Sequence, residues 1–336
     1  MKISELLRKK ILETEVGGVI NRLKINKRRN SLFFGDIFTE YVKICERAGH
    51  AGEMMEIGQT WMLLYFDQLV PSVIKKLPLP VFSGIMRKVW TNLGMMEDFR
   101  MEKRGDVIEI VTRGEAITGA IGDNMFSVGL FLGICNSFFS SGIDIVSVAQ
   151  KKEISSYVFR KSGKKPPEVL PKERKTYERL NHFKPINGLT LDKASRNRIF
   201  HLRENRIFFR NRPVYTVENT LYHLVGEKNI MAGEIAGISY RFFNAILDKD
   251  ASDVSRLGLL KNLLHAMGWG LVKIITDDEK TVFEIMHPPF GLQKGADNWT
   301  FLINSILGFM RVVDGRFAIQ SVSLRGKTLR VVYSKA

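Results

Sequence analysis

The sequence predicts an α+β protein made of two tandem repeats, each a helical layer on an antiparallel sheet with N- and C-terminal hairpins. Three observations predict it. Blocks of the first half recur in the same order in the second half, and both ends of each half alternate polar and apolar residues, as strands do. Between those ends, apolar residues recur three and four positions apart, which is typical of amphipathic helices packed on a sheet.

The clearest duplicated block is AGEMMEIGQTWMLLYFD, residues 51–67, which aligns with AGEIAGISYRFFNAILD, residues 232–248, at an offset of 232 − 51 = 181. Downstream, LGMMEDF around Gly94 matches MGWGLVK around Gly268 at an offset of 268 − 94 = 174. Shorter matches follow in order, including VIEIV with VFEIM and GDNMF with GADNWTF. Order kept over many blocks predicts that each half is one folding unit.

Between the halves lies a basic connector without an apolar period. Residues 161–195 hold 9 Lys or Arg against 4 Asp or Glu, and four of the ten prolines lie between Lys161 and Pro185. The N-terminus alternates charged residues with Ile3, Leu6 and Leu7, which predicts an amphipathic helix rather than a secretory leader. We therefore expect an N-terminal helix at 1–20, a first repeat at 21–160, a basic linker at 161–195 and a second repeat at 196–336.

Within the first repeat, the alternation at 22–25 and 31–34 predicts a hairpin, repeated by RIFHL and RIFFR in the second half. The final helix should begin at Asp123-Asn124, and its counterpart at Asp297-Asn298, because short polar side chains accept bonds from first-turn amides. The remaining elements expected in the first repeat are helices at 37–47, 52–69, 81–93 and 124–139, and strands at 99–104, 107–112, 143–149 and 155–160.

The composition excludes several classes of protein. A chain of 336 residues with 45% hydrophobic and 26% charged residues is neither disordered nor, with two cysteines, a disulfide scaffold. The longest apolar stretch, residues 116–139, is interrupted by Asp123, Asn124 and Asn136, so we expect no transmembrane segment and a cytoplasmic location. The net charge of +16 indicates attraction to anions.

No catalytic or metal-binding pattern is present in the sequence. The six histidines never form HExxH or HxH, and phosphate-binding glycine loops and the GxSxG elbow are absent. The acidic run Asp277-Asp278-Glu279 lies between two expected strands, where acidic residues favour a turn over an acid–base pair. We therefore expect no enzyme, no catalytic residue and no metal site, and leave any cofactor unknown.

Two clusters are candidate binding sites. Large apolar side chains of one helix in each half could line an adaptable pocket, although such a stripe is more often core. Arginines interleaved with phenylalanines in both N-terminal hairpins could grip phosphates, although alternate residues of a half-exposed strand are polar in any case. The pocket candidates are Trp61, Tyr65, Phe66, Tyr240 and Phe243. The polyanion-binding candidates are Arg22, Lys24, Arg28, Arg29, Arg198, Arg203, Arg206, Arg210 and Arg212.

The order of elements resembles the 4-vinyl reductase small-molecule-binding domain, itself similar to the haem nitric-oxide sensor fold and the TRAPP vesicle-tethering subunits. The resemblance is carried by the small-residue helix with Gly52, Glu53 and Gly58, and by a helix that closes on Leu93-Gly94, followed by paired strands, a glycine-rich helix and a hairpin. It implies such a domain in each half, and a lipid or a tetrapyrrole held between helices and sheet.

The chain departs from the metal-binding and redox members of that family, which carry cysteines before the last helix and within the last hairpin. Here Met125 and Phe126 open that helix, Cys135 lies inside it, and the second half has no cysteine. A haem sensor also needs an axial histidine on a helix, and the first repeat has only His50. The resemblance therefore implies neither metal nor redox chemistry for this chain.

Taken together, these features favour a non-enzymatic, ligand-responsive regulatory module with an apolar small-molecule pocket and a basic surface for nucleic acid or an acidic protein. The alternative is a constitutive nucleic-acid-binding or assembly scaffold with no small ligand. Self-association as a dimer is left open, as are the identity of the ligand and the pathway.

Overall fold

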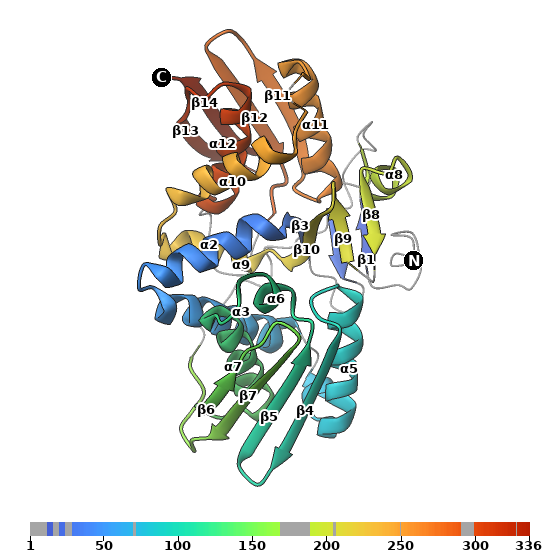
Figure 1. Cartoon of the computed structure of the whole chain (residues 1–336), viewed down its shortest axis with the longest axis vertical. Coiled ribbons are helices and arrows are strands. Elements are labelled where there is room, and N and C mark those ends of the chain that lie inside the picture. Colours follow the sequence, from blue (N-terminus) through green and yellow to red (C-terminus); the bar gives the residue numbers. More distant parts are fainter. Residues whose placement is uncertain are drawn as a thin grey trace. The chain divides into compact units, whose positions relative to one another are not determined.

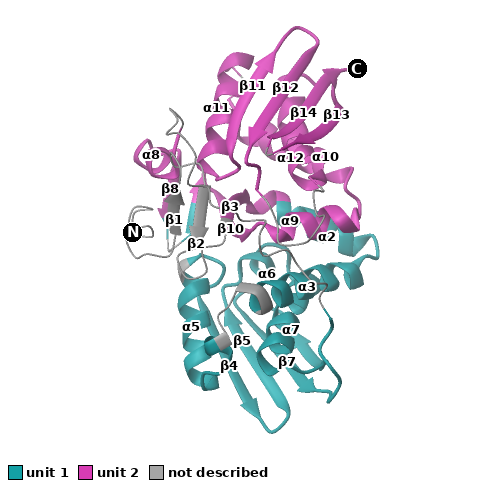
Figure 2. Ribbon diagram, turned by 180° about the vertical axis from the view of Figure 1, so that it is seen from behind, with its two compact units in different colours: residues 1, 38–172, 203–207 teal, residues 2–37, 173–202, 208–336 magenta. Residues whose placement is uncertain are grey.

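The structure is a computed structural model that describes residues 12–15, 20–23, 29–69, 72–168, 189–203, 206–248, 250–289, 299–326 and 328–336 (Figure 1). It mixes helices with three antiparallel sheets, as the sequence predicted at the level of the fold class. The chain forms two compact units, coloured separately in Figure 2. Among the described residues, unit 1 contains residues 38–168, 203, 206 and 207, and unit 2 contains the remainder.

Unit 1 is a four-stranded sheet with helices, in the order β4-β5-β7-β6. The expected helices and strands are present to within a few residues, with the short helices α4 and α6 in addition. The helices are α2 (Gly35–Arg47, which enters the unit at residue 38), α3 (Ala51–Leu69), α4 (Ser72–Lys75), α5 (Leu79–Asn92), α6 (Ala116–Ile121) and α7 (Met125–Phe139). The strands are β4 (Asp98–Arg104), β5 (Val107–Arg113), β6 (Ile143–Ala149) and β7 (Ile154–Lys161).

Unit 2 contains a sheet of the same topology, β11-β12-β14-β13. In the edge strand of each sheet the pairing register shifts once, between Ile145 and Ser147 in β6 and between Ile319 and Ser321 in β13. The two irregularities are 319 − 145 = 174 residues apart, the offset found in the sequence. The elements around this sheet are α9 (Thr220–Lys228), α10 (Glu234–Ile246), α11 (Asp253–Ala266), α12 (Thr300–Val313), β11 (Leu271–Thr276), β12 (Lys280–Met286), β13 (Phe317–Arg325) and β14 (Thr328–Lys335).

A third sheet joins strands from both halves of the sequence, in the order β1-β2-β3-β10-β9-β8. At its centre β3 pairs antiparallel with β10, from Phe34 opposite Val214 to Asn30 opposite Glu218. The expected hairpins are present, since β2 pairs with β3 and β8 lies beside β9. The strands are β1 (Leu12–Glu15), β2 (Ile20–Leu23), β3 (Arg29–Phe34), β8 (Phe200–Arg203), β9 (Arg206–Phe209) and β10 (Arg212–Glu218).

Strand β3 belongs to the core of unit 2, although it lies in the first half of the sequence. The Leu32 amide donates to the Met267 carbonyl at 2.8 Å, and the Trp269 indole donates to the Leu32 carbonyl at 3.0 Å. The Phe33 ring stacks on Trp269, with centroids 5.8 Å apart, and contacts Phe301 at 4.8 Å. Consequently the compact units do not follow the linear boundaries 21–160 and 196–336, because residues up to 37 cluster with the second half.

Three local expectations need correction or fall outside the described residues. The helix expected at 1–20 is wrong for two segments, Leu12–Glu15 and Ile20–Leu23, which are strands because their backbones pair with each other. Residues 1–11 and 16–19 are not described. The expected linker contains helix α8 (Leu191–Arg196), where the Thr190 hydroxyl accepts from the Lys193 amide at 3.0 Å. Asn124 caps α7 as expected, whereas Asp297-Asn298 lie outside the described residues.

Glycines allow close helix packing in both units. A β-carbon at Gly129 of α7 would overlap the carbonyl oxygen of Met55 in α3, and one at Gly308 of α12 would overlap Ser239 and Ala236 of α10. These glycines therefore let two helix backbones approach each other directly. No helix among the described residues has the length and apolar character needed to cross a membrane.

Candidate functional site

The segment Leu191–Arg212, which we call the basic hairpin, comprises α8, β8, β9 and the turn into β10. It carries seven Lys or Arg against two Asp or Glu, a net charge of 7 − 2 = +5. Five of these cations belong to unit 2 and are exposed. They lie on α8, on the turn that follows it, on the turn between β9 and β10, and at the start of β10: Lys193, Arg196, Arg198, Arg210 and Arg212. Figure 1 shows α8 beside the start of β8.

Antiparallel pairing brings the two ends of the β8–β9 hairpin together. The Phe200 and Phe209 rings are in contact, with centroids 5.9 Å apart, and His201 stacks on Phe208. This alignment places Arg198, just before β8, beside the end of β9 that precedes Arg210. The cations of α8, of the Arg198 turn and of the β9–β10 turn therefore gather at the open end of the hairpin.

Two of these arginines sit in left-handed backbone conformations. Arg198, with φ of 58°, follows the C-terminus of α8, and the Ile199 amide donates to the Ala194 carbonyl at 2.9 Å, as in a Schellman cap. Arg210 and Asn211, with φ of 46° and 65°, form the two-residue turn between β9 and β10. Glycine or asparagine is the locally favoured residue at such positions.

Several arginines of the basic hairpin also have partners within unit 2. Arg196 pairs with Asp192 one helical turn away. Arg210 donates to the carbonyl of Ile246, the last residue of α10, where a cation complements the helix dipole. Arg212 lies 3.2 Å from the Asp36 carboxylate; burial raises the pKa of Asp36, and Arg212 lowers that pKa only in part.

The other predicted polyanion-binding residues are placed differently. Arg203 and Arg206 lie at the hairpin tip, which clusters with unit 1, and there Arg206 donates to the Gly114 carbonyl at 2.6 Å. Arg22 and Arg29 are backbone partners in β2 and β3, and nothing is described of their side chains. Lys24 and Arg28 lie outside the described residues. Among the predicted residues whose side chains are described, the structure thus brings together Arg198, Arg210 and Arg212.

The predicted pocket residues do not meet in one site. Trp61 and Phe66 are buried in α3 of unit 1, where Trp61 stacks on Phe126 and Phe66 contacts Phe82. Tyr65, half-buried in the same helix, packs on Phe66. In unit 2, Tyr240 is 38% exposed, and Phe243 lines an apolar cavity.

That cavity lies within unit 2 and is bounded by Phe33, Phe34, Leu260, Met267 and Trp269 among others. Its volume is about 10 Å³, roughly what one water molecule requires. A tetrapyrrole or a lipid tail would need the surrounding side chains to move. The apolar-ligand pocket therefore stays a prediction.

A buried carboxylate at the start of α6 was not anticipated from the sequence. Glu115, 6% exposed, accepts hydrogen bonds from Thr112, from Thr118 at 2.6 Å and from Tyr157 at 2.9 Å. Burial raises the pKa of Glu115, and the three hydroxyl donors lower it in part. In this region the sequence predicted only that Asn124 caps a helix. The side-chain amide of Asn124 also donates to the Thr118 hydroxyl at 3.2 Å.

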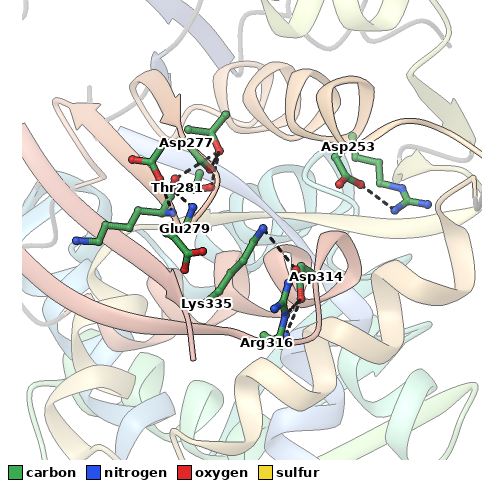
Figure 3. A network of polar contacts seen from close by, with 10 residues as sticks. Asp253, Asp277, Glu279, Thr281, Asp314, Arg316 and Lys335 are labelled. Atoms are coloured by element: carbon green, nitrogen blue, oxygen red, sulfur yellow. Dashed lines mark hydrogen bonds and ion pairs between the residues drawn. The ribbon is translucent and has the colours of Figure 1, made fainter.

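The acidic run after β11 forms a turn, as expected (Figure 3). The Asp277 carboxylate accepts from the backbone amides of Glu279 and Lys280 at 3.0 and 2.7 Å, and these amides lower the pKa of Asp277. Nearby, Asp314 is bound by Arg316 at 2.8 Å and Lys335 at 3.6 Å. Across the described part of the chain, no three His, Cys, Asp or Glu side chains are grouped as metal ligands.

No protein-family model and no curated protein sequence matches the chain. The candidate site is therefore defined by its own residues: the exposed cations of unit 2 at the open end of the basic hairpin.

Proposed function

We propose that this chain is a non-enzymatic binding protein built from two copies of one α+β unit, and that the basic hairpin of unit 2 binds a phosphate-bearing polyanion. The equal strand order of the two four-stranded sheets supports the duplication, as does the irregularity that recurs 174 residues later. A shared strand order together with a register shift at the same place in both edge strands supports duplication more strongly than the sequence blocks alone.

The exposure of five cations in one short segment carries the polyanion proposal. Their ion pairs do not prevent this role, because an exposed pair such as Arg212–Asp36 contributes only about 0.2–1 kcal/mol. A polyanion offers several phosphates to these cations at once and releases condensed counterions when it binds, which a single exposed carboxylate does not. A phosphate-bearing ligand can therefore compete with the intramolecular partners for the guanidinium groups.

The salt dependence of binding tests the proposal. Five cations that each neutralise one phosphate give a slope of log K against log[salt] of about −3.5 for a single strand and −4.5 for a duplex. We expect fluorescence anisotropy with labelled 20-nucleotide oligomers to show a slope near these values. Anionic vesicles, measured in parallel by flotation, distinguish a lipid surface from a nucleic acid.

A triple variant with Gln in place of Lys193, Arg196 and Arg198 should reduce the slope by about two to three. The matched control replaces Arg316, Arg325 and Arg330 of unit 2, which are also exposed but lie outside the basic hairpin. Equal losses in the two triple variants would show that net charge acts without a defined site. Unchanged affinity in the basic-hairpin variant would refute the proposal.

Native mass spectrometry of the purified chain distinguishes a ligand-responsive module from a constitutive scaffold. The cavity lined by Phe243, about 10 Å³, holds no apolar ligand without rearrangement of its side chains. A scaffold gives the bare polypeptide mass. An additional mass that disappears on denaturation would instead support the ligand-responsive module.

A further inference from the structure

The edge strand β6 of unit 1 leaves apolar side chains exposed. It is the last strand in the order β4-β5-β7-β6, and every residue from 144 to 149 is exposed (Figure 1). Ile145, Val146 and Val148 are 39%, 47% and 36% exposed. Because an edge strand directs backbone amides and carbonyls away from its own sheet, it can pair with a strand of another chain.

The pairing register assigns two of these side chains to the covered face of the sheet. Ile145 lies opposite Phe159 and Val148 opposite Tyr157, and both rings of β7 are fully buried. Opposite residues of an antiparallel pair share a face, so Ile145 and Val148 extend the buried face to the edge of the sheet. The register shift at Val146 does not end the strand, since residues on both sides of it pair with β7. A further strand beside β6 would therefore cover apolar surface.

The other edge strands of the two four-stranded sheets carry charges that oppose pairing with a second copy of the chain. Strand β4 has the sequence DFRMEKR, in which five of seven residues are charged. Strand β11 has Lys273 near its middle, and a lysine on an edge strand discourages pairing with another strand. Strand β13, the counterpart of β6, is preceded by Arg316 and ends at Arg325, so two antiparallel copies of it would bring these arginines together.

The charges at the two ends of β6 instead suit antiparallel pairing of two copies. Asp144 lies at the start of the strand, Lys151 follows its end, and both side chains are exposed. Residues 145–150 between them are uncharged. With a two-fold axis near Ser147 and Val148, Asp144 of each copy meets Lys151 of the other. Parallel pairing would place Asp144 of one copy against Asp144 of the other.

We propose that β6 is a self-association edge, at which two copies of the chain pair antiparallel and join their unit 1 sheets into one. The pairing gives the edge backbone groups hydrogen-bond partners and covers the exposed apolar side chains, and two Asp144–Lys151 ion pairs fix the register. The inference goes beyond the proposed function and is independent of it, because β6 belongs to unit 1 and the exposed cations of the basic hairpin belong to unit 2.

Sedimentation equilibrium of the full chain, after removal of nucleic acid at high salt, tests the proposal. We expect the wild type to dimerise reversibly and Val148→Lys to be monomeric, because two added ammonium groups would face each other near the two-fold axis. The matched control is Val322→Lys in β13, which is 40% exposed and lies 322 − 148 = 174 residues later. It should dimerise as the wild type does. Circular dichroism and the thermal midpoint verify that each variant is folded.

Exchanging the end charges tests the register. Asp144→Lys and Lys151→Asp should each weaken dimerisation by about fivefold or more, because two attractive pairs become repulsive. The double variant should regain wild-type association, since the opposite charges have only changed places.

Three results would overturn the proposal. The first is a wild type that stays monomeric at millimolar concentration. The second is a dimer that Val148→Lys leaves intact, or that Val322→Lys disrupts equally. The third is a double charge variant that associates no better than the single variants, which would exclude the antiparallel register. Each of these results leaves polyanion binding by the basic hairpin unaffected.

Discussion

Replacing Phe33 by alanine should destabilise unit 2, although Phe33 belongs to the first half of the sequence. The ring is 1% exposed and lies against Tyr222, Trp269 and Phe301, with centroid distances of 5.5, 5.8 and 4.8 Å. Truncation of such a buried phenylalanine costs about 3–5 kcal/mol, since it removes apolar contacts and leaves a cavity. For a unit of this size the midpoint of thermal unfolding should fall by on the order of 10 °C.

Hydrogen exchange followed by mass spectrometry localises the loss. We expect peptides from 208–336 to lose protection in Phe33→Ala, and peptides from 72–168 to keep theirs. The matched control is Phe99→Ala in unit 1, whose ring is also 1% exposed and packs on Trp90 and Phe131. It should give the opposite pattern.

Two results would refute this reasoning. The first is a loss of protection in Phe33→Ala that is confined to unit 1, which would mean that β3 does not pair with β10 in solution. The second is a decrease in the free energy of unfolding below about 1 kcal/mol, because a ring buried among three aromatic side chains cannot be removed at so small a cost.

Two further predictions concern packing and pH. Gly129→Ala should lower the free energy of unfolding by about 1–3 kcal/mol in denaturant titration, because the new β-carbon would overlap the Met55 carbonyl. The control Gly52→Ala has open space around it and should be neutral or stabilising. Equal effects of the two substitutions would exclude close helix packing as the cause. Burial lowers the pKa of His265, whose Nε2 accepts from the Val272 amide at 2.8 Å, so only the unfolded chain gains a proton as pH falls below about 6.5. The free energy of unfolding of the wild type should therefore fall from pH 6.5 towards pH 5, and that of His265→Gln should fall less. Parallel plots of unfolding free energy against pH for the two proteins would contradict this role of His265.

The local elements were predictable because their signals are local. The three-to-four spacing of apolar residues located α3, α5 and α7 to within a few residues, and Asn124 marked the start of α7. The turn at Asp277 was correctly predicted because a carboxylate accepting from amides two and three residues ahead is a property of neighbouring residues.

The candidate site was predictable only in part. Composition identified the basic hairpin, because a run of cations is visible in any sequence. It did not show that Arg210 would bind the end of α10 or that Arg206 would bind Gly114, since both partners are remote in the chain. The buried Glu115 was missed for the same reason, because its partner Tyr157 lies 42 residues away.

The sequence by itself determined most of the longer helices and strands between residues 35 and 161, the recurrence of sequence blocks at an offset of 174, and the location of the excess positive charge. Only the tertiary structure decided that β3 completes unit 2 rather than the half of the chain that encodes it. The physical reason is that the apolar residues Leu32 and Phe33 show that both faces of this strand must be buried, but they do not show which elements bury them. In the structure the strand pairs with β10 and packs against the rings of Trp269 and Phe301.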